Sequence, residues 1–467
     1  MTRPPRDSAK DVVSGISIGI PTLRDAETTR RPGAARFPSL IGFCAEHPLR
    51  APVRHPLDGD AAVLIGRGPV DREEATGKSV LLVDDPRMSR QHVLLSPVGE
   101  GWRIQDLGSL NGSMLNGERL ERAVLVPGDV IELGRTLLVY SDAASPQPAV
   151  AGTGFFTYSA RHAAALASLE AVTRTALSVL LLGETGTGKE VLAHEIHRLS
   201  GRPGPYVAVN CGALPESLVA SELFGYRRGA FSGAVEEREG LVRASSGGTL
   251  FLDEVADLPA SGQAALLRVL QEHEVLAVGG TRPLKVDLRV IAATHRDLDA
   301  LVEAGSFRAD LLARLSGFTF RLPPLRERRE DIGGLIATLL SRLGSAAAQA
   351  RFSMKAARAL FLAEWPRNVR ELEQALTSAV ALARGQLVDV DHLPDSLKSR
   401  SPRGPAMVSA ISAAPALQDH ELRQTLVALL EQHRGNLAEV ARAMAKAPTQ
   451  IRRWLKRLGL DPDAYRG

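Results

Sequence analysis

The sequence predicts a multidomain protein with an all-β sandwich, an α/β domain that carries a phosphate-binding loop, and a small all-α domain. Short apolar runs alternate with glycine turns in residues 39–140, which is typical of short strands in a sandwich. An apolar strand, a glycine loop and an amphipathic helix follow one another in residues 179–199, the order that a phosphate-binding loop requires. Apolar residues at helical spacing recur in residues 417–467.

Composition limits the classes of function. The chain has 467 residues, enough for about three domains, and is 44% hydrophobic, so sizeable cores are possible. It shows neither an apolar run long enough to span a membrane nor a secretory signal, so we expect a cytoplasmic protein without membrane contact. Its two cysteines, Cys44 and Cys211, supply neither a disulfide framework nor a metal site. The net charge is only +4, so basic character is informative only where it is local.

The first domain follows a polar segment. Residues 1–38 are rich in Arg, Pro, Thr and Ser and are expected to form a disordered tail. In residues 39–140, apolar runs such as Ala62–Ile65 and Val130–Leu133 alternate with turns, and polar motifs stand just past the predicted strands. A sandwich can bring such loops to one edge. An arginine and a hydroxyl that converge there suit a phosphate, because a guanidinium forms bidentate charge-assisted bonds.

The spacing of these motifs resembles the forkhead-associated (FHA) domain, a reader of phosphothreonine peptides, over residues 50–138. The resemblance implies that His92 is a structural buttress. The alternative is that the motifs only maintain loop geometry, and Leu110 replaces a small polar residue that is common at its position. The implied phosphopeptide residues are Arg67 and Ser89 on the phosphate, Arg90 nearby, and Asn111 on the peptide backbone.

The second domain begins after an expected linker at residues 141–153. The glycine loop lets backbone N–H groups turn inward around a polyphosphate, and Lys189 can reach the terminal phosphates of ATP at the helix N-terminus. The alternative is an ordinary glycine turn. Glu190 stands where a Ser or Thr would normally supply a Mg²⁺ ligand. The expected nucleotide-binding loop consists of Gly183, Glu184, Thr185, Gly186, Thr187, Gly188, Lys189 and Glu190.

A second apolar strand supports this reading. Residues 247–254 form an apolar run that ends in two adjacent carboxylates. This is the form of a Walker B element, in which Asp253 would face Mg²⁺ and Glu254 would polarise the attacking water. An acidic pair after a strand can also simply start a helix. Its pairing with the glycine loop favours the catalytic interpretation.

Residues 154–397 carry further motifs and closely resemble the AAA+ domain of bacterial enhancer-binding proteins, the ATPases that activate sigma-54 RNA polymerase. In that family a glutamate such as Glu190 is the usual end of the nucleotide loop. The resemblance implies an α/β domain at residues 154–321, a helical lid at residues 322–397 and a homo-oligomeric ring, expected to be a hexamer. The matching motifs are Glu222–Gly225, Gly229–Ala234, Val278–Pro283, Phe307–Leu311, Leu322–Arg328 and Trp365–Leu372.

The resemblance also assigns roles in ATP hydrolysis. Asn210 corresponds to the residue that restrains the catalytic glutamate, and Arg370 to a lid arginine that senses the phosphates. Arg308 and Arg314 correspond to arginine fingers that enter the neighbouring subunit's site. By composition alone the two arginines could instead form a solvated helix face, with Asp310 as a pairing partner.

Two positions depart from the family pattern. His295 stands where the family has a polar amide that senses the γ-phosphate; its imidazole can donate a hydrogen bond and can titrate near physiological pH. Arg367 replaces a glycine, which we interpret as a loop effect.

The loop implied to contact sigma factor also carries a substitution. It consists of Gly229, Ala230, Phe231, Ser232, Gly233 and Ala234, and the family has a threonine in place of Ser232. Phe231 at its tip would contact sigma factor. Alternatively, Phe231 folds back onto its own subunit.

The last domain follows a linker at residues 398–416. In residues 417–467 the apolar pattern predicts three helices, and the third is basic, as in a helix-turn-helix. It resembles the Fis-type module that ends many enhancer-binding proteins; a merely solvated basic helix is the alternative. We expect base contacts from Thr449, Gln450 and Arg453, and phosphate contacts from Arg452, Lys456 and Arg457.

Together the motifs predict a transcriptional activator that binds double-stranded DNA upstream of a promoter. It would hydrolyse ATP with Mg²⁺ to remodel the closed complex of sigma-54 RNA polymerase. The FHA domain would bind a phosphothreonine-containing protein and replace the phosphoacceptor sensor of two-component-like signalling. Two alternatives stay open: a non-hydrolysing DNA-binding regulator whose AAA+ domain only oligomerises, and a signalling scaffold that mainly binds phosphopeptides.

Overall fold

A computed structural model describes residues 37–57, 61–68, 74–75, 78–99, 101–143, 149–151, 155–232 and 234–398, with five single residues between 430 and 440. The chain divides into two compact units, Met1–Lys398 and Ser399–Gly467. Residues 1–36, nearly all of the expected linker at 398–416, and all six expected DNA-contacting residues lie outside the described part. No helix within the described part is long and apolar enough to cross a membrane.

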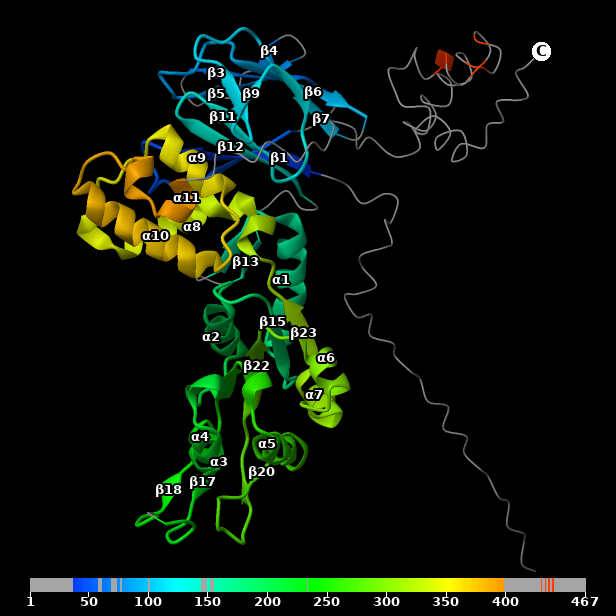
Figure 1. Ribbon diagram of the computed structural model, residues 1–467, viewed down its shortest axis with the longest axis vertical. Coiled ribbons are helices and arrows are strands. Elements are labelled where there is room, and N and C mark those ends of the chain that lie inside the picture. Colours follow the sequence, from blue (N-terminus) through cyan, green and yellow to red (C-terminus); the bar gives the residue numbers. More distant parts are fainter. Residues whose placement is uncertain are drawn as a thin grey trace, which may run out of the picture. The chain divides into compact units, whose positions relative to one another are not determined.

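The N-terminal domain is a sandwich of two six-stranded sheets, as the sequence predicted (Figure 1). Its buried core includes Leu40, Ile65, Leu95 and Ile104. The first sheet has the order β2-β1-β12-β11-β8-β9, formed by β1 (Phe37–Cys44), β2 (Val53–Pro56), β8 (Ser113–Leu115), β9 (Glu118–Leu120), β11 (Val130–Leu133) and β12 (Thr136–Ala143). The second has the order β10-β7-β6-β3-β5-β4, formed by β3 (Val63–Arg67), β4 (Glu74–Ala75), β5 (Lys78–Val83), β6 (Val93–Val98), β7 (Gly101–Asp106) and β10 (Arg122–Val124).

The segment between the first two domains contains strand structure. β12 continues three residues into the stretch expected to be a linker. Further along, β13 (Ala149–Ala151) pairs antiparallel with β14 (Phe155–Thr157). Part of the stretch expected to be a linker therefore forms strands.

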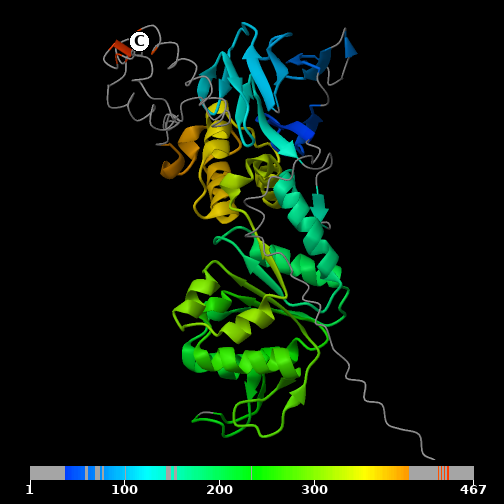
Figure 2. The ribbon, with the colours of Figure 1, turned by 90° about the vertical axis from the view of Figure 1, so that its right-hand side faces the viewer.

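The central domain contains a five-stranded sheet of order β16-β19-β22-β15-β23, in which every described pair is parallel. Its three inner strands, β19, β22 and β15, are largely buried because helices cover both faces (Figure 2). One face packs on α1 (Ala160–Thr173) and α2 (Lys189–Ser200). The other face packs on α3 (Glu216–Phe224), α5 (Ala260–Glu272) and α7 (Ala309–Leu315). The strands are β15 (Val179–Leu182), β16 (Tyr206–Asn210), β19 (Thr249–Asp253), β22 (Arg289–Thr294) and β23 (Phe318–Arg321).

Two short hairpins project from this domain (Figure 1). One joins β17 (Gly225–Tyr226) to β18 (Arg238–Glu239) and contains the expected sigma-contact loop. The other joins β20 (Glu274–Val275) to β21 (Leu284–Lys285). Short helices α4 (Leu241–Ala244) and α6 (Leu298–Glu303) complete the domain.

The lid is helical. It consists of α8 (Ile332–Arg342), α9 (Met354–Leu362), α10 (Asn368–Ala383) and α11 (Asp395–Lys398). Their apolar faces meet around fully buried residues such as Ile336, Leu360, Trp365 and Leu376.

Candidate functional site

The glycine loop has the geometry of a polyphosphate cradle. It connects β15 to α2, and Gly186 and Gly188 take φ values of 78° and 105°, which side chains rarely adopt. A Cβ atom at Gly186 would lie 2.2 Å from the Arg367 carbonyl oxygen, so only glycine fits there. Lys189 is 6% exposed, and its Nζ donates to the carbonyls of Gly183 at 2.8 Å and Glu184 at 3.3 Å. Burial lowers the pKa of Lys189, although Glu254 and Asp253 oppose the shift.

The lid holds this loop in place. Asn368 Nδ2 donates to a Glu184 carboxylate oxygen and to the Thr185 carbonyl, both at 3.1 Å. Arg326 donates to both carboxylate oxygens of Glu184, at 2.9 and 2.6 Å, and these bonds lower the pKa of Glu184. Arg328 is buried and donates to the Thr187 carbonyl at 2.9 Å.

Sequence reasoning quoted these lid residues only as parts of family motifs and gave them no role. The usable signal was the unusual density of arginines in residues 326–329. Arg367 itself has φ −109°, an ordinary value, whereas the following Asn368 takes the left-handed φ of 53°. A side chain at position 367 therefore creates no backbone strain.

The two carboxylates lie at the carboxyl end of β19. Burial raises the pKa of Asp253, and the neighbouring Glu254 raises it further. Glu254 has a φ of 50°, a strained value for a residue other than glycine. One oxygen of Glu254 accepts from the Thr294 hydroxyl at 3.1 Å and lies 2.9 Å from Nδ1 of His295.

Asn210 and His295 differ in their contacts with Glu254. The side-chain oxygen of Asn210 accepts from the backbone N–H groups of Gly212 and Ala213 at 3.0 and 3.1 Å. In the described part of the chain, the hydrogen bonds that restrain Glu254 come from Thr294 and His295 rather than from Asn210. Sequence spacing does not reveal which residues hydrogen-bond Glu254, because this depends on how β16, β19 and β22 align in the sheet.

The finger candidates lie at the two ends of α7. Arg308 forms an exposed bidentate pair with Asp310, at 3.0 and 2.7 Å, which is the pairing considered from the sequence. Within the described residues, neither Arg308 nor Arg314 bonds to the glycine loop of its own chain. Arg370 lies nearer: its Cβ would be 3.1 Å from a Cβ placed at Gly186.

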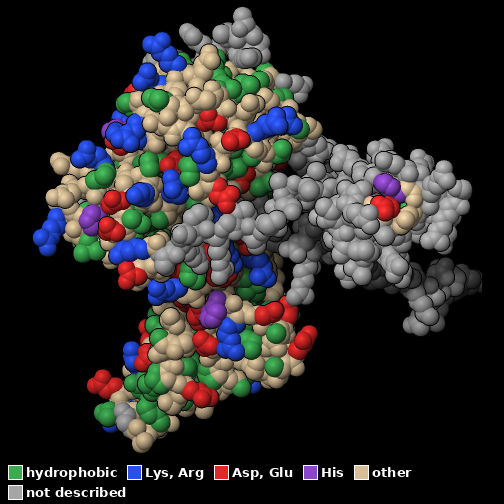
Figure 3. All heavy atoms as spheres, turned by 45° about the horizontal axis from the view of Figure 1, so that its top comes forward, with side chains coloured by type: hydrophobic (Ala, Val, Ile, Leu, Met, Phe, Trp, Pro, Cys, Tyr) green, Lys and Arg blue, Asp and Glu red, His purple; other side chains and the backbone are tan. Residues whose placement is uncertain are grey.

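The candidate sigma-contact loop combines exposure with an internal contact. Phe231 is 43% exposed, and its ring centroid lies 5.0 Å from that of Tyr226. A Cβ at Gly279, in the second hairpin, would lie 2.8 Å from the Ala230 Cβ, so the two hairpin loops touch. Figure 3 shows hydrophobic side chains gathered at this tip. Ser232 is exposed, and Gly233 lies outside the described residues.

The FHA loops meet at one edge of the sandwich. A Cβ at Gly66 would lie 1.8 Å from the Arg90 carbonyl oxygen, so this close approach requires glycine. Arg67 donates to the Pro86 carbonyl at 3.3 Å, and Asn111 Nδ2 donates to the Arg87 carbonyl at 2.6 Å. The Ser89 hydroxyl oxygen accepts from the Leu110 N–H at 3.1 Å. These contacts bring the four expected phosphopeptide residues onto adjoining loops.

His92 has the geometry expected of a buttress. It is fully buried, its Nδ1 accepts from the Ser89 N–H at 3.0 Å, and its Nε2 lies 3.3 Å from the Gly112 carbonyl. Burial lowers the pKa of His92, so the ring is neutral at physiological pH. The His92 ring thus joins the loop that carries Ser89 to the loop that carries Gly112.

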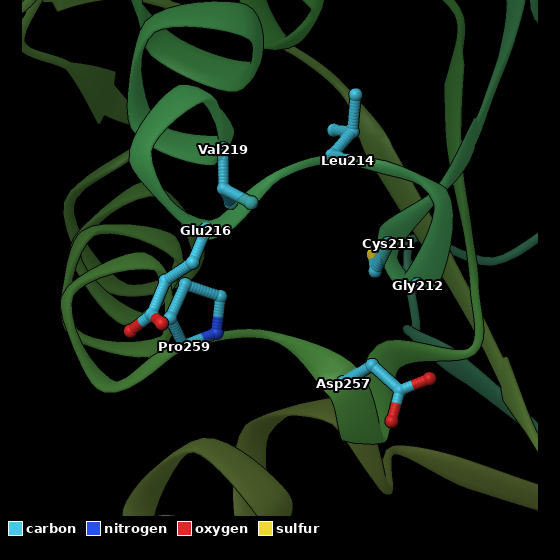
Figure 4. A pocket seen from close by; sticks show the side chains of 7 residues that line it. All are labelled: Cys211, Gly212, Leu214, Glu216, Val219, Asp257 and Pro259. Atoms are coloured by element: carbon cyan, nitrogen blue, oxygen red, sulfur yellow. The ribbon is translucent and has the colours of Figure 1, made fainter.

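A hollow of about 290 Å³ lies beside the β16 end of the central sheet (Figure 4). Asp257, on its rim, is also paired with Arg296 at 3.0 Å. Burial raises the pKa of Cys211 to about 12, so this residue remains a thiol. The lining residues are Cys211, Gly212, Leu214, Glu216, Val219, Asp257 and Pro259.

Comparison with known families assigns the domains. Residues 155–321 match the sigma-54 interaction domain, and residues 326–410 match the AAA+ ATPase lid domain. The central domain is a sigma-54 interaction domain. Together with its lid it forms an AAA+ ATPase domain, as the sequence predicted. Residues 63–134 match the FHA domain, which confirms that resemblance too.

Several curated regulators and a solved structure are similar to this chain. The chain is 45% identical over 318 residues to the nitric oxide reductase transcription regulator NorR1 of Cupriavidus necator, which covers 63% of this chain and 61% of that protein. It is 40% identical over 299 residues to the transcriptional regulatory protein GlrR of Escherichia coli, covering 63% and 66%. A crystal structure of NtrX from Brucella abortus in complex with ATP is 30% identical, covers 67% of this chain and 71% of that one, and has a TM-score of 0.48. The chain thus spans about three fifths of the length of the first of these relatives.

Proposed function

We propose that this protein is a sigma-54-dependent transcriptional activator that hydrolyses ATP to remodel the closed RNA polymerase complex. The observation that carries the proposal is the convergence of Lys189 with Asp253 and Glu254 beneath a loop held by the lid. The sigma-54 interaction domain, with its exposed Phe231, supplies the surface that would contact sigma factor.

The residues present fit ATP and Mg²⁺. Burial and then the charge of Glu254 raise the pKa of Asp253, and a divalent cation beside the two carboxylates would favour their ionised forms. Mg²⁺, when bound, neutralises phosphate charge. Gly183–Lys189 would bind the phosphates, Asp253 would hold the cation, and Arg370 would contact the phosphates from the lid. This arrangement does not require a Mg²⁺ ligand from Glu190, because Asp253 would supply a carboxylate.

Glu254 would act on the attacking water. Its Oε2 oxygen accepts hydrogen bonds from Thr294 and His295, which hold the side chain in position, and its second oxygen would accept the proton of a water molecule. His295 would thereby restrain the carboxylate of Glu254, in addition to any contact that it makes with phosphate.

Arg308 and Arg314 would complete the site of a neighbouring subunit in a ring, for which we propose a hexamer. Arg308 must exchange Asp310 for phosphate, which is feasible because that pair is exposed.

The FHA domain would make the activator respond to a phosphothreonine protein. Arg67 and Ser89, with Arg90 beside them, lie on adjoining loops where a phosphate would accept several hydrogen bonds, and Asn111 would bind the peptide backbone. Residues 417–467 would bind upstream double-stranded DNA through the basic helix predicted from the sequence.

The proposal is tested with purified full-length protein, sigma-54 RNA polymerase and a sigma-54 promoter. Open complexes should form with ATP and not with a non-hydrolysable ATP analogue. ATP hydrolysis without open complexes would favour the scaffold alternative. Absence of hydrolysis would favour a regulator whose AAA+ domain only oligomerises.

A further inference from the structure

Three adjacent strands of one FHA sheet, β1, β12 and β11, have buried residues on both of their faces. Alternate residues of β1, β11 and β12 point to opposite sides, and one set fills the core of the sandwich. An antiparallel sheet commonly keeps a polar face toward solvent, but here the second face is also apolar. That second set is buried with the lid helices in one continuous cluster: Ile41, Phe43, Ala45, Val130, Leu137 and Val139.

Specific contacts fix the sandwich on α9 of the lid. The rings of Phe43 and Phe361 lie 5.1 Å apart between centroids. Arg358 donates to both carboxylate oxygens of Glu132 at 2.7 and 2.8 Å, and Glu132 is 13% exposed. The Phe352 N–H donates to the Ala45 carbonyl at 2.8 Å. Apolar, ionic and backbone contacts thus occur across one interface.

The lid helix α8 is shaped for this contact. A Cβ at Gly333 would lie 3.2 Å from atoms of both Phe43 and Pro52. Gly333 lies in the first turn of α8, where the sandwich leaves little room for a side chain.

The same lid segment reaches the nucleotide loop. Phe361 touches the sandwich, and seven residues later Asn368 binds Glu184 and Thr185 of the glycine loop. Trp365, which is buried and lies between them, takes a left-handed φ of 49°, and Asn368 itself takes one of 53°. Strained backbone of this kind persists only where its surroundings hold it.

On the opposite side, the sandwich links this interface to its phosphate loop. The buried Asp85 accepts from the backbone N–H groups of Arg87 and Arg135. Arg87 belongs to the loop that Asn111 binds, and the Arg135 carbonyl accepts from the Ala45 N–H at 3.2 Å. Ala45 in turn contacts Phe352 of the lid. The contacts therefore run without interruption from the peptide-binding edge to the lid.

We propose that the FHA domain is docked on the AAA+ lid and that this interface couples phosphopeptide binding to nucleotide binding. The proposal rests on the proposed function of the FHA loops as a phosphothreonine-peptide site. It specifies the regulation: the phosphopeptide acts within its own chain, through α9 and the segment from Phe361 to Asn368, on the loop that holds the phosphates. Because coupling between two binding sites is reciprocal, nucleotide must change phosphopeptide affinity by the same factor.

The test uses full-length protein, a degenerate peptide pool with a central phosphothreonine, and a non-hydrolysable ATP analogue. Calorimetry measures the affinity for the analogue with and without saturating pool, and the affinity for the pool with and without analogue. We expect each ligand to change the affinity for the other by at least about five-fold. The unphosphorylated pool should change neither.

The ion pair supplies the variants. Glu132→Arg and Arg358→Glu should each reduce the coupling to less than two-fold, and the double variant, which restores an opposite-charge pair, should recover it. Glu239→Arg is the matched control, because it breaks a surface pair with Arg243 away from this interface. Arg358→Gln, which removes charge without creating repulsion, replaces either single variant that does not fold.

The outcomes separate the two levels of the proposal. If the phosphorylated pool binds but leaves the affinity for the analogue unchanged, the coupling is overturned while the phosphopeptide site stands. If the pool does not bind, the phosphopeptide site and the coupling fail together. Full coupling in both single variants overturns this interface as the route.

Discussion

Nδ1 of His295 lies 2.9 Å from a carboxylate oxygen of Glu254, and the His295 backbone N–H donates to the same oxygen at 3.3 Å. Burial alone would raise the pKa of Glu254. The hydrogen bond from His295 and the charge of Lys189 outweigh burial, and the net pKa lies below its ordinary value. His295 therefore both restrains the proposed base and keeps it ionised.

Substitution of His295 should move the acid limb of ATPase activity. His295→Ala removes the largest contribution that lowers the pKa of Glu254, so Glu254 becomes protonated at a higher pH. We expect the low-pH decline of kcat to shift to higher pH, with a smaller shift for His295→Gln, which retains a hydrogen-bond donor. Steady-state kcat between pH 5 and 9 measures it. Superimposable profiles for wild type and both variants would show that His295 does not tune the base.

Lys189 and Glu254 should separate nucleotide binding from hydrolysis. Lys189→Ala removes the buried ammonium that faces the phosphates, so ATP binding should fall by at least about ten-fold, the effect of 1.4 kcal/mol. Glu254→Gln keeps the shape of the side chain but cannot accept a proton, so ATP should bind while turnover falls by about 10²–10⁴-fold. Calorimetry and steady-state hydrolysis on the same preparations distinguish these effects. Comparable turnover in wild type and Glu254→Gln contradicts the assignment.

The sequence carried the local chemistry of the site better than its tertiary partners. Each of the two motifs is contiguous in sequence with its strand. The glycine loop therefore predicted β15, and the Asp253–Glu254 pair predicted the end of β19. The partner of Glu254 was not predictable, because His295, which directly follows β22, lies 41 residues away in sequence.

The docking of the FHA domain was missed for a related reason. Leu137–Tyr140 is an unbroken apolar run, which identifies a strand but does not say what covers its second face. Gly333 in a lid helix gave a further signal, but its meaning emerges only when Phe43 is found against it.

Arg67 should carry much of the affinity for a phosphothreonine peptide. Its guanidinium donates to the carbonyl of the exposed Pro86, a contact that it can exchange for a phosphate. Arg67→Ala should weaken binding by about 1.5–3 kcal/mol, the scale of a hydrogen bond to a charged group. Calorimetry with phosphorylated and unphosphorylated pools measures it, and Arg122→Ala on β10 serves as a control. Equal affinity for both pools would reject the phosphopeptide site.

Glu330 should make the stability of the docked unit depend on pH. Burial raises its pKa from 4.5 to about 7; nearby Asp331 adds to the shift, while Ser141 and Arg54 oppose it. The folded state then binds the proton more tightly than the unfolded state, so stability is full below about pH 4.5 and falls as pH rises toward 7. The decline amounts to about 3 kcal/mol.

Glu330→Gln should remove this decline. The difference in stability between the variant and wild type should therefore favour the variant more at pH 8 than at pH 5. Thermal unfolding of the full chain at both pH values measures it. Glu364→Gln is the control, because that side chain is 51% exposed. An equal difference between Glu330→Gln and wild type at both pH values would show that Glu330 titrates normally.

Phe231 should be needed for promoter opening and dispensable for ATP hydrolysis. Its ring packs on Tyr226 and still leaves 43% of the residue exposed, so it is anchored yet able to contact a partner. Phe231→Ala should leave ATPase activity within about two-fold and reduce open-complex formation by at least ten-fold, about 1.4 kcal/mol of lost contact. Ser232→Ala should also reduce opening, whereas Ser232→Thr adds one methyl, worth at most about 0.8 kcal/mol, and should change it a few-fold.

Tyr226→Leu separates anchoring from contact, because it removes the ring beneath Phe231 but not Phe231 itself. ATP hydrolysis and open-complex formation on a sigma-54 promoter are measured side by side. If Phe231→Ala opens promoters as well as wild type does, the loop is not the remodelling contact, and the alternative of an AAA+ domain without remodelling activity gains support.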